Sequence, residues 1–175
     1  LGGAGLHPSL PVGQSGVVMK EGMSVMVDIA GNFYGYLTDC TRTFAVGRLA
    51  EKAVFAHQVS INICDAVAAA GKPGARCEDL YNLALKMAAD AGLADCFMGA
   101  AQKAKFIGHG TGLVINEQPV LGARSKDVLE PGMCIALEPK FVIPGTGAVG
   151  IEDTFLVTAS GMEVLTPCDR ELVSL

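Results

Sequence analysis

The sequence lacks several features that would place it in a common functional class. It contains no tryptophan, only three histidines, and 13 Lys and Arg residues against 18 acids, which gives a net charge of −5. Because the basic residues form no cluster, we expect no nucleic-acid partner. No uninterrupted apolar run approaches about 18 residues, so we also expect no membrane-spanning segment.

Paired cysteine motifs are also absent. The six cysteines form no C-x-x-C pair and fall mostly within apolar segments, at Cys40, Cys64, Cys77, Cys96, Cys134 and Cys168. This usage predicts free, buried thiols and is typical of a protein from a reducing, cytoplasmic environment.

A short segment occurs twice in the chain, and each copy ends in an acid. Segments 18–28 and 128–138 share a Gly-Met step, and Asp28 and Glu138 occupy corresponding places. In each copy a turn signal precedes a short apolar run, which is typical of a buried strand. We therefore expect two copies of one unit related by a pseudo-twofold axis, with the two acids converging.

Such acids are costly at the end of a buried strand. An ionised carboxylate removed from water costs several kcal/mol unless a positive charge meets it. No Lys or Arg stands beside Asp28 or Glu138 in the sequence at a spacing that suggests pairing. The sequence therefore predicts a bound cation.

Two further acids, Asp39 and Glu152, follow the repeats in strand-like segments. A glycine-bearing connection separates each of them from the first acid of its unit, which predicts two hairpins. Facing residues on adjacent antiparallel strands are neighbours, so we expect Asp28 beside Asp39 and Glu138 beside Glu152.

His109 is the fifth candidate, and glycines at 108, 110 and 112 frame it. Any one of these acids alone would be an ordinary solvated strand-end residue, and His109 alone would equally be a core histidine. Together, four carboxylates and one imidazole contain too many oxygens for a structural zinc site. They suit two divalent ions about 3.5–4 Å apart.

The contexts of these five residues resemble the methionine aminopeptidase, proline dipeptidase and Xaa-Pro aminopeptidase superfamily. The Thr-Asp-x-Thr-Arg-Thr-Phe run, the Gly-His-Gly-x-Gly motif, and the Glu-Pro and Ile-Glu-Asp steps agree in order and spacing, and the Xaa-Pro branch is the most similar. The resemblance implies an α/β (α+β) pita-bread fold, in which a curved antiparallel sheet carries helices on its outer face. It also implies five metal ligands, Asp28, Asp39, His109, Glu138 and Glu152.

The implied activity is that of an exopeptidase that depends on two divalent ions, Mn²⁺, Co²⁺, Zn²⁺ or Fe²⁺. It would release the N-terminal residue of a short peptide substrate, with Glu138 as general base besides its role as ligand. Creatinase resembles this fold but lacks the metal ligands. A small-amide hydrolase related to creatinase remains an alternative.

Two departures from the family pattern favour another alternative, a metal- or peptide-binding module with impaired turnover. Asn116 stands where the peptidases usually carry a second, substrate-contacting histidine. An amide can donate a hydrogen bond to a developing oxyanion but cannot carry a proton, and Asn116 is equally explained as a turn residue. A loop histidine expected before the first ligand strand is also missing, with His7 the nearest candidate. His57, in a helical segment, is expected to be structural.

Helical spacing predicts helices over 49–71 and 76–92. The first unit lacks corresponding helices, so we interpret residues 1–48 as a remnant of a truncated first repeat and 49–175 as the second repeat. Residues 1–175 would form one catalytic domain from the C-terminal portion of a larger protein. With 50% hydrophobic residues we expect exposed apolar patches or a homodimer. We expect Arg42 to contact another carboxylate or a backbone carbonyl, and Thr41, two positions from Asp39 and on the same face of the strand, to orient the Asp39 side chain.

Overall fold

The structure is a computed structural model that describes residues 18–100 and 102–175. Two strands come first in the described chain, two helices follow, and the remaining strands come after them, which is an α+β order. The elements are β1 (Ser24–Phe33), β2 (Tyr36–Ala45), α1 (Glu51–Ala70), α2 (Cys77–Asp90), the 3₁₀ turn η1 (Ala94–Cys96), β3 (Phe106–Gly110), β4 (Glu117–Gly122), β5 (Cys134–Leu137), β6 (Lys140–Ile143), β7 (Gly147–Gly150), β8 (Asp153–Thr158), β9 (Gly161–Val164) and β10 (Val173–Ser174).

The strands form sheets that are almost entirely antiparallel. One sheet has the order β1-β2-β10, a larger one has the order β4-β3-β5-β8-β9, and β6 pairs with β7. Among the described strands, only the short β10 runs parallel to its neighbour, β2. The predicted α+β class with antiparallel sheets is therefore confirmed.

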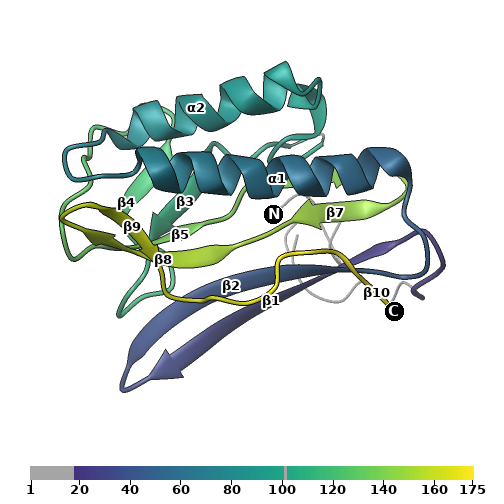
Figure 1. The fold of residues 1–175 in the computed structure, drawn as a ribbon, viewed down its shortest axis with the longest axis horizontal. Helices are drawn as coiled ribbons and strands as arrows, with labels where there is room; N and C mark the ends of the chain where they lie inside the picture. The colour runs from purple at the N-terminus through teal and green to yellow at the C-terminus, as the bar shows by residue number, and fades with distance from the viewer. Residues whose placement is uncertain (1–17, 101) are drawn as a thin grey trace.

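The two helices lie side by side on one side of the strands, and the β1–β2 hairpin lies furthest from them (Figure 1). α1 begins at Glu51 and ends before Gly71, where a Gly-Lys-Pro-Gly sequence cannot continue a helix. α2 has two acids in its first turn, where the helix dipole favours negative charge. Both helices occupy the segments that the sequence predicted, with ends within two residues.

α1 is long and apolar enough to cross a membrane by length and composition alone. In the structure half of the apolar stretch of α1 is buried, and the helix packs against β6, β7 and β9. This packing accounts for its apolar character, as in the core helix of a globular domain.

The core lies between the helices and the strands. Ile63 and Val67 of α1 pack there with strand residues Leu121, Ile135 and Phe141, all of which are fully buried. A core on the helix side leaves the ends of the central strands available for polar side chains.

The β1–β2 hairpin carries the exposed apolar surface that the composition predicted. Ile29, Phe33, Tyr34 and Tyr36 are 60%, 76%, 88% and 65% exposed.

The cysteines agree only in part with the predicted free, buried thiols. Cys64, Cys77 and Cys96 are free and buried, whereas Cys168 is free and exposed.

Candidate metal centre

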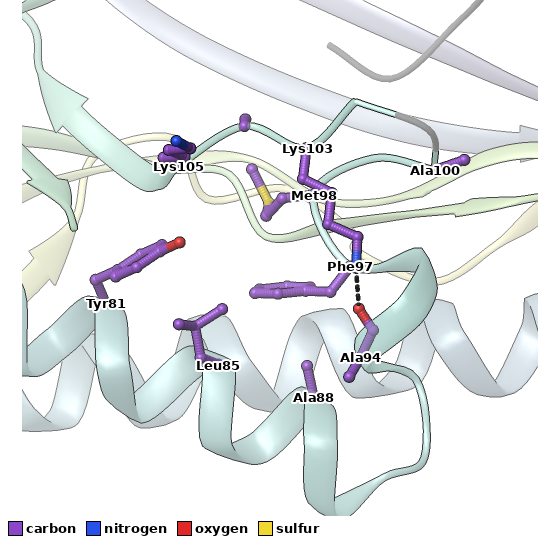
Figure 2. Close-up of a pocket in the computed structure, with 10 residues that line it drawn as sticks. Tyr81, Leu85, Ala88, Ala94, Phe97, Met98, Ala100, Lys103 and Lys105 are labelled. Atoms are coloured by element: carbon purple, nitrogen blue, oxygen red, sulfur yellow. Dashed lines mark hydrogen bonds between the residues drawn. The ribbon is translucent and has the colours of Figure 1, made fainter.

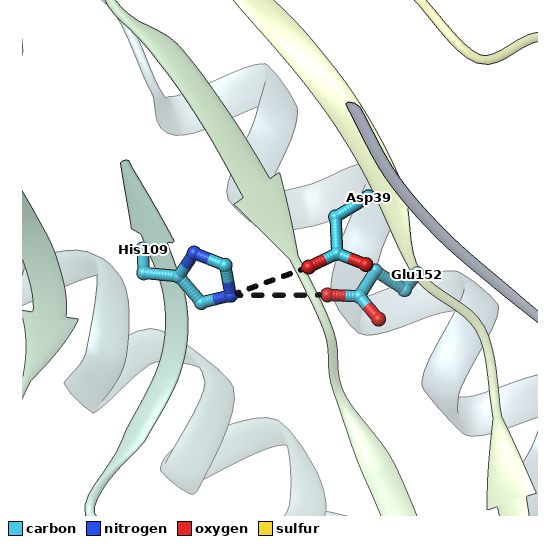
Figure 3. A group of neighbouring side chains, drawn as sticks. All are labelled: Asp39, His109 and Glu152. Atoms are coloured by element: carbon cyan, nitrogen blue, oxygen red, sulfur yellow. Dashed lines mark ion pairs between the residues drawn. The ribbon is translucent and has the colours of Figure 1, made fainter. Parts of the chain in front are cut away.

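Three side chains from distant parts of the chain meet in the interior, as Figure 3 shows. Asp39 lies in β2, His109 in β3, and Glu152 directly before β8. The His109 Nε2 atom lies 3.8 Å from Asp39 Oδ2 and 4.0 Å from Glu152 Oε1, and the candidate ligand atoms all lie within 4.8 Å of one another. All three residues are buried. Two carboxylate oxygens and an imidazole nitrogen at this spacing form a donor set suited to a divalent transition metal.

Glu138 follows β5 and joins the same cluster. Its Oε1 atom lies 3.4 Å from His109 Nε2. In the register of β5 with β8, Leu137 faces Asp153, so the next pair places Glu138 opposite Glu152. The strand register thus agrees with the expectation that these two acids are neighbours.

Asp28 lies at the edge of the cluster beside Asp39, as expected, but the two acids do not face each other directly across the hairpin. In the β1–β2 register Asp28 faces Thr41, whereas Asp39 faces Ala30. The two-residue turn at 34–35 fixes this register, which differs by two residues from the expected one. Because side chains alternate with a period of two, both acids still lie on one face as diagonal neighbours. Asp28 is exposed and Asp39 is buried.

The expectation that no basic residue meets these acids is also wrong. The Lys140 Nζ atom lies 2.8 Å from Glu138 Oε2, and both side chains are buried. Lys140 is two residues beyond Glu138, and the strand period places such residues on the same side of the backbone. A protein cation therefore already meets one of the four acids.

Close backbone packing holds His109 in place. A Cβ atom on Gly108 would collide with the carbonyl oxygen of Ala136, and one on Gly110 would collide with that of Gln118. The glycines thus allow β3 to approach both of its neighbours, as their position around His109 predicted. The His109 Nδ1 atom lies 3.0 Å from the Gly110 carbonyl. An N–H at Nδ1 can donate to that oxygen, which orients the ring so that Nε2 faces the acids.

Two threonines connect the acids reciprocally across the β2–β8 contact. The Thr41 hydroxyl donates to Glu152 Oε2 at 2.7 Å. The Thr154 hydroxyl accepts from the Asp39 backbone N–H at 2.9 Å and donates to the Asp39 carbonyl at 2.8 Å. Each threonine follows one acid by two residues and contacts the other acid. Thr41 therefore orients Glu152, not the Asp39 side chain of its own strand.

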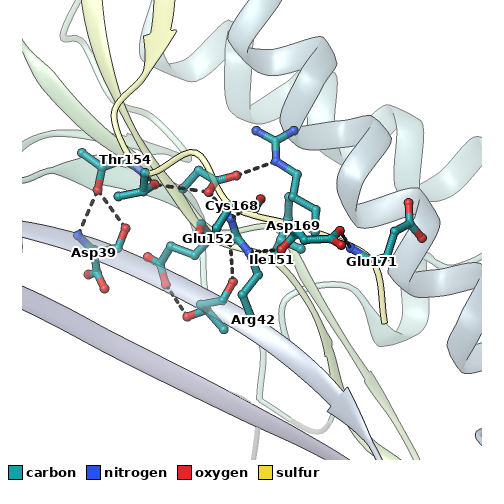
Figure 4. Close-up of polar contacts among 12 residues, drawn as sticks. Asp39, Arg42, Ile151, Glu152, Thr154, Cys168, Asp169 and Glu171 are labelled. Carbon is teal, nitrogen blue, oxygen red and sulfur yellow. Dashed lines mark hydrogen bonds and ion pairs between the residues drawn. The ribbon is translucent and has the colours of Figure 1, made fainter. Parts of the chain in front are cut away.

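Arg42 contacts the backbone of Glu152 and the side chain of Asp153, next to the centre (Figure 4). Its guanidinium lies 2.6 Å from Asp153 Oδ1 and donates to the Glu152 carbonyl at 2.8 Å and to the Asp169 carbonyl at 2.7 Å. Arg170 Nε lies 2.8 Å from the other Asp153 oxygen, at ion-pair distance but without hydrogen-bond alignment. Arg42 thus contacts both a carboxylate and backbone carbonyls, the two kinds of contact expected for it.

The acids of the cluster have displaced pKa values. Burial, followed by the charge of Glu138, raises the pKa of Glu152 to about 8. Burial, followed by the charge of Asp28, raises the pKa of Asp39 to about 6. Burial alone would raise the pKa of Glu138, but the hydrogen bond to His109 and the charge of Lys140 hold it at about 2. Negative charge is therefore poorly compensated around Asp39 and Glu152, where a bound cation would relieve it.

Asn116 lines a pocket that opens beside the centre. The pocket has a volume of about 430 Å³, and its lining includes Asn116, His109 and Phe106. Asn116 itself is exposed, in the loop that precedes β4. The structure thus places the Asn116 amide and the His109 ring at one cavity.

The other two histidines lie apart from this centre. The His57 Nε2 atom lies 2.7 Å from the Arg170 carbonyl, so this buried ring connects α1 to the C-terminal segment, in agreement with a structural role. His7 lies outside the described residues.

A second pocket, shown in Figure 2, lies at a distance from the cluster. It has a volume of about 440 Å³ and is lined mainly by apolar residues of α2 and of the segment that follows it, among them Tyr81, Leu85 and Phe97. It contains no acid or histidine, so it adds no chemistry to the centre.

Sequence reasoning missed Lys140 and Thr154. A signal existed for both, because each residue follows a candidate acid by two positions and therefore lies on its face of a strand. The contact of Arg42 with Asp153 had a weaker signal, since these residues are distant in sequence and only the docking of β2 on β8 brings them together.

Comparison with known proteins agrees with this geometry. A family model described as Metallopeptidase family M24 matches residues 3–159. The Xaa-Pro dipeptidase of Pyrococcus furiosus is 33% identical over 171 residues, which cover 97% of this chain and 47% of that protein. The uncharacterized peptidase YqhT of Bacillus subtilis is 35% identical, with 98% and 47% covered. The chain therefore spans about half the length of these curated relatives.

Solved structures show the same similarity. The dipeptidase of Pyrococcus horikoshii superposes with a TM-score of 0.85 at 29% identity, covering 99% of this chain and 47% of that one. The prolidase of Pyrococcus furiosus superposes with a TM-score of 0.79 at 33% identity, covering 87% of this chain and 43% of that one.

Proposed function

The chain belongs to metallopeptidase family M24, and on this premise we propose that it forms the catalytic part of an exopeptidase with two divalent ions. Its substrates would be short peptides with proline in the second position. Two relatives named Xaa-Pro dipeptidases are 33% and 32% identical over nearly the whole chain, which supports this substrate class.

One observation carries the proposal: Asp39, His109, Glu138 and Glu152 converge in a buried cluster. The donors are mainly carboxylate oxygens with a single imidazole, a set that accepts Mn²⁺, Co²⁺, Fe²⁺ or Zn²⁺. The raised pKa values of Asp39 and Glu152 indicate that Lys140 leaves the negative charge of these two acids poorly compensated. Asp28, at the edge of the cluster, would complete the ligands.

Each residue has a role in hydrolysis under this proposal. The bound ions would lower the pKa of water and polarise the scissile carbonyl. Glu138 is ionised, as a general base must be, and its carboxylate would accept the proton of the attacking water. The Asn116 amide, at the adjoining pocket, would donate a hydrogen bond to the carbonyl oxygen of the substrate.

Metal loading and peptide cleavage test this proposal together. The protein is loaded with Mn²⁺, Co²⁺ or Zn²⁺ and freed of excess metal, and bound ions are counted beside cleavage of Xaa-Pro and Met-Xaa peptides. We expect about two ions per chain and cleavage of the Xaa-Pro set. Asp39→Asn should abolish loading, whereas Asp90→Asn, which alters an exposed acid paired with Lys86 on α2, should leave it unchanged.

Asn116 favours a second candidate, a binding module that retains the metal but not the turnover. An amide in this position cannot transfer a proton. Two bound ions without hydrolysis of any peptide would support this second reading. A protein that binds no divalent ion under any loading condition contradicts both readings.

A further inference from the structure

The apolar pocket of Figure 2 lies between α2 and the segment that leads from η1 toward β3. Its volume of about 440 Å³ falls within the range of about 300–1,000 Å³ that is typical of small-molecule sites. Leu85, Phe97 and Met98 supply much of its apolar lining. The function proposed above uses none of these residues, so the pocket is a separate feature of the molecule.

Contacts with the strands and with the following segment hold the inner wall of this pocket in place. Phe97 and Phe141 of β6 form an isolated β-bridge, and their ring centroids are 5.0 Å apart. The Met98 N–H donates to the Lys140 carbonyl at 2.9 Å, and the Met98 carbonyl accepts from the Ala104 N–H at 2.8 Å. Phe97 and Met98 are each only 2% exposed. A wall that is already ordered loses little entropy when a ligand binds, which favours affinity.

The hydroxyl and the charged side chains of the lining are suited to an anion. Figure 2 shows the Tyr81 hydroxyl directed into the pocket, and no hydrogen bond joins it to another of the residues drawn there. Burial raises the pKa of Tyr81, so the hydroxyl keeps its proton and can donate at neutral pH. Among the described residues, the lining contains two lysines and no acid. Lys103 donates to the Ala94 carbonyl at 2.7 Å, whereas Lys105 is exposed, so its ammonium can meet a bound negative charge.

We propose that this pocket binds a small amphipathic carboxylate, an alkyl or aryl chain whose apolar body lies between Leu85, Phe97 and Met98. The Tyr81 hydroxyl donates to one carboxylate oxygen, and the Lys105 ammonium offsets the charge at the mouth of the pocket. The apolar walls disfavour a strongly hydrated anion such as free phosphate, and the lysines disfavour an amine. The inference does not depend on the proposed function, because no acid or histidine of the metal centre lines the pocket.

Calorimetric titration of the full chain with 4-phenylbutyrate, 4-phenylbutanol and 4-phenylbutylamine tests the proposal. The three probes share one apolar body and differ in the charge of the end group. We expect the carboxylate to bind at least about tenfold more tightly than the alcohol, and the amine more weakly still. Tyr81→Phe removes only the hydroxyl and should weaken carboxylate binding about tenfold.

A charge placed on the pocket wall provides a second test. Leu85 is 40% exposed on α2, and Leu85→Glu should abolish carboxylate binding by repulsion. Val54→Glu makes the same kind of change at a position of α1 that is 48% exposed and should leave the affinity unchanged. In protein labelled with ¹³C at the methionine methyl groups, the NMR signal of Met98 should shift with the carboxylate, whereas that of Met162 in β9 should not.

Several outcomes would overturn the proposal. These are no binding of 4-phenylbutyrate, equal affinities for the carboxylate and the alcohol, an unchanged affinity in Leu85→Glu, or a Met98 signal that stays in place. Binding of acetyl-alanyl-phenylalanine at least about tenfold more tightly than 4-phenylbutyrate would assign the pocket to the C-terminus of a peptide instead. If Leu85→Glu does not fold, the comparison of the three probes and Tyr81→Phe still decide the matter. Metal loading and peptide cleavage test the proposed function separately.

Discussion

Replacing Arg42 with methionine removes the positive charge that faces a fully buried acid. Asp153 has no exposed surface, and its Oδ1 atom lies 2.6 Å from the Arg42 guanidinium. Breaking a buried ion pair by removing one partner costs about 3–5 kcal/mol, because the remaining charge stays uncompensated. Arg170 still lies 2.8 Å from the other carboxylate oxygen, so we expect the lower end of that range, about 3 kcal/mol.

Urea denaturation of the metal-free protein, followed by circular dichroism, measures this loss. The midpoint should fall with an unchanged m-value, and the melting temperature should fall by roughly 6–12 °C for a chain of this size. Asp153→Asn in the Arg42→Met background should cost less than it does alone, because the two changes remove the same interaction.

Arg76→Met provides a matched control. Its ion pair with Glu78 is 3.2 Å long but more than half exposed on the arginine side, and such pairs contribute about 0–1 kcal/mol. If Arg42→Met destabilises the protein no more than Arg76→Met, the reasoning about the buried pair is refuted.

Further predictions concern the centre and its support. Thr41→Val removes the 2.7 Å hydrogen bond to Glu152 and should weaken Mn²⁺ binding about 10–100-fold in a calorimetric titration. Thr158→Val, which removes a 2.7 Å hydrogen bond to the Gly161 carbonyl at a partly buried site, is the control. Glu152, with its pKa raised to about 8, is mainly protonated at pH 7 in the metal-free protein. Mn²⁺ binding should therefore release protons, and the affinity should rise as the pH rises toward 8. Calorimetry in buffers of different ionisation enthalpy measures the release, and finding no released protons would contradict this prediction. The raised pKa also means that Glu152 makes the metal-free protein less stable as the pH rises from about 4.5 through 8, and urea midpoints across this range check the sign. Gly108→Ala forces a Cβ into the Ala136 carbonyl and should cost about 1–3 kcal/mol in urea denaturation.

Periodicity and local motifs were sufficient to predict the elements and the candidate residues. Helical spacing located α1 and α2, and glycine-bearing turns between apolar runs located the hairpins. The chemistry of four acids and a glycine-framed histidine predicted a common cluster, and the structure brings Asp39, His109, Glu138 and Glu152 within a few ångströms of one another. These features depend on short stretches of chain, where a sequence pattern carries most of the information.

Register and tertiary pairing could not be predicted in the same way. The β1–β2 register depends on which two residues form the turn, and the two glycines in that connection, Gly31 and Gly35, allowed more than one choice. Tyr34 and Gly35, both with positive φ, form the turn and place Asp28 opposite Thr41. The strand period placed Lys140 on the same side of the backbone as Glu138, but the pairing of its Nζ atom with the Glu138 carboxylate depended on the direction of both side chains in the fold.

The contact between β2 and β8 has a consequence for the order of events during synthesis. The Thr41 and Glu152 backbones exchange two hydrogen bonds of 3.1 Å, although 111 positions separate the two residues. Contacts of such long range form late, because the entropy of closing the loop must be overcome first. A nascent chain that has not yet exposed Glu152 holds Asp39 on an unpaired hairpin with a single acid neighbour. Assembly of the Asp39, His109 and Glu152 cluster therefore follows synthesis of the segment that contains Glu152, and the assembled cluster marks a polypeptide in which β2 has docked on β8.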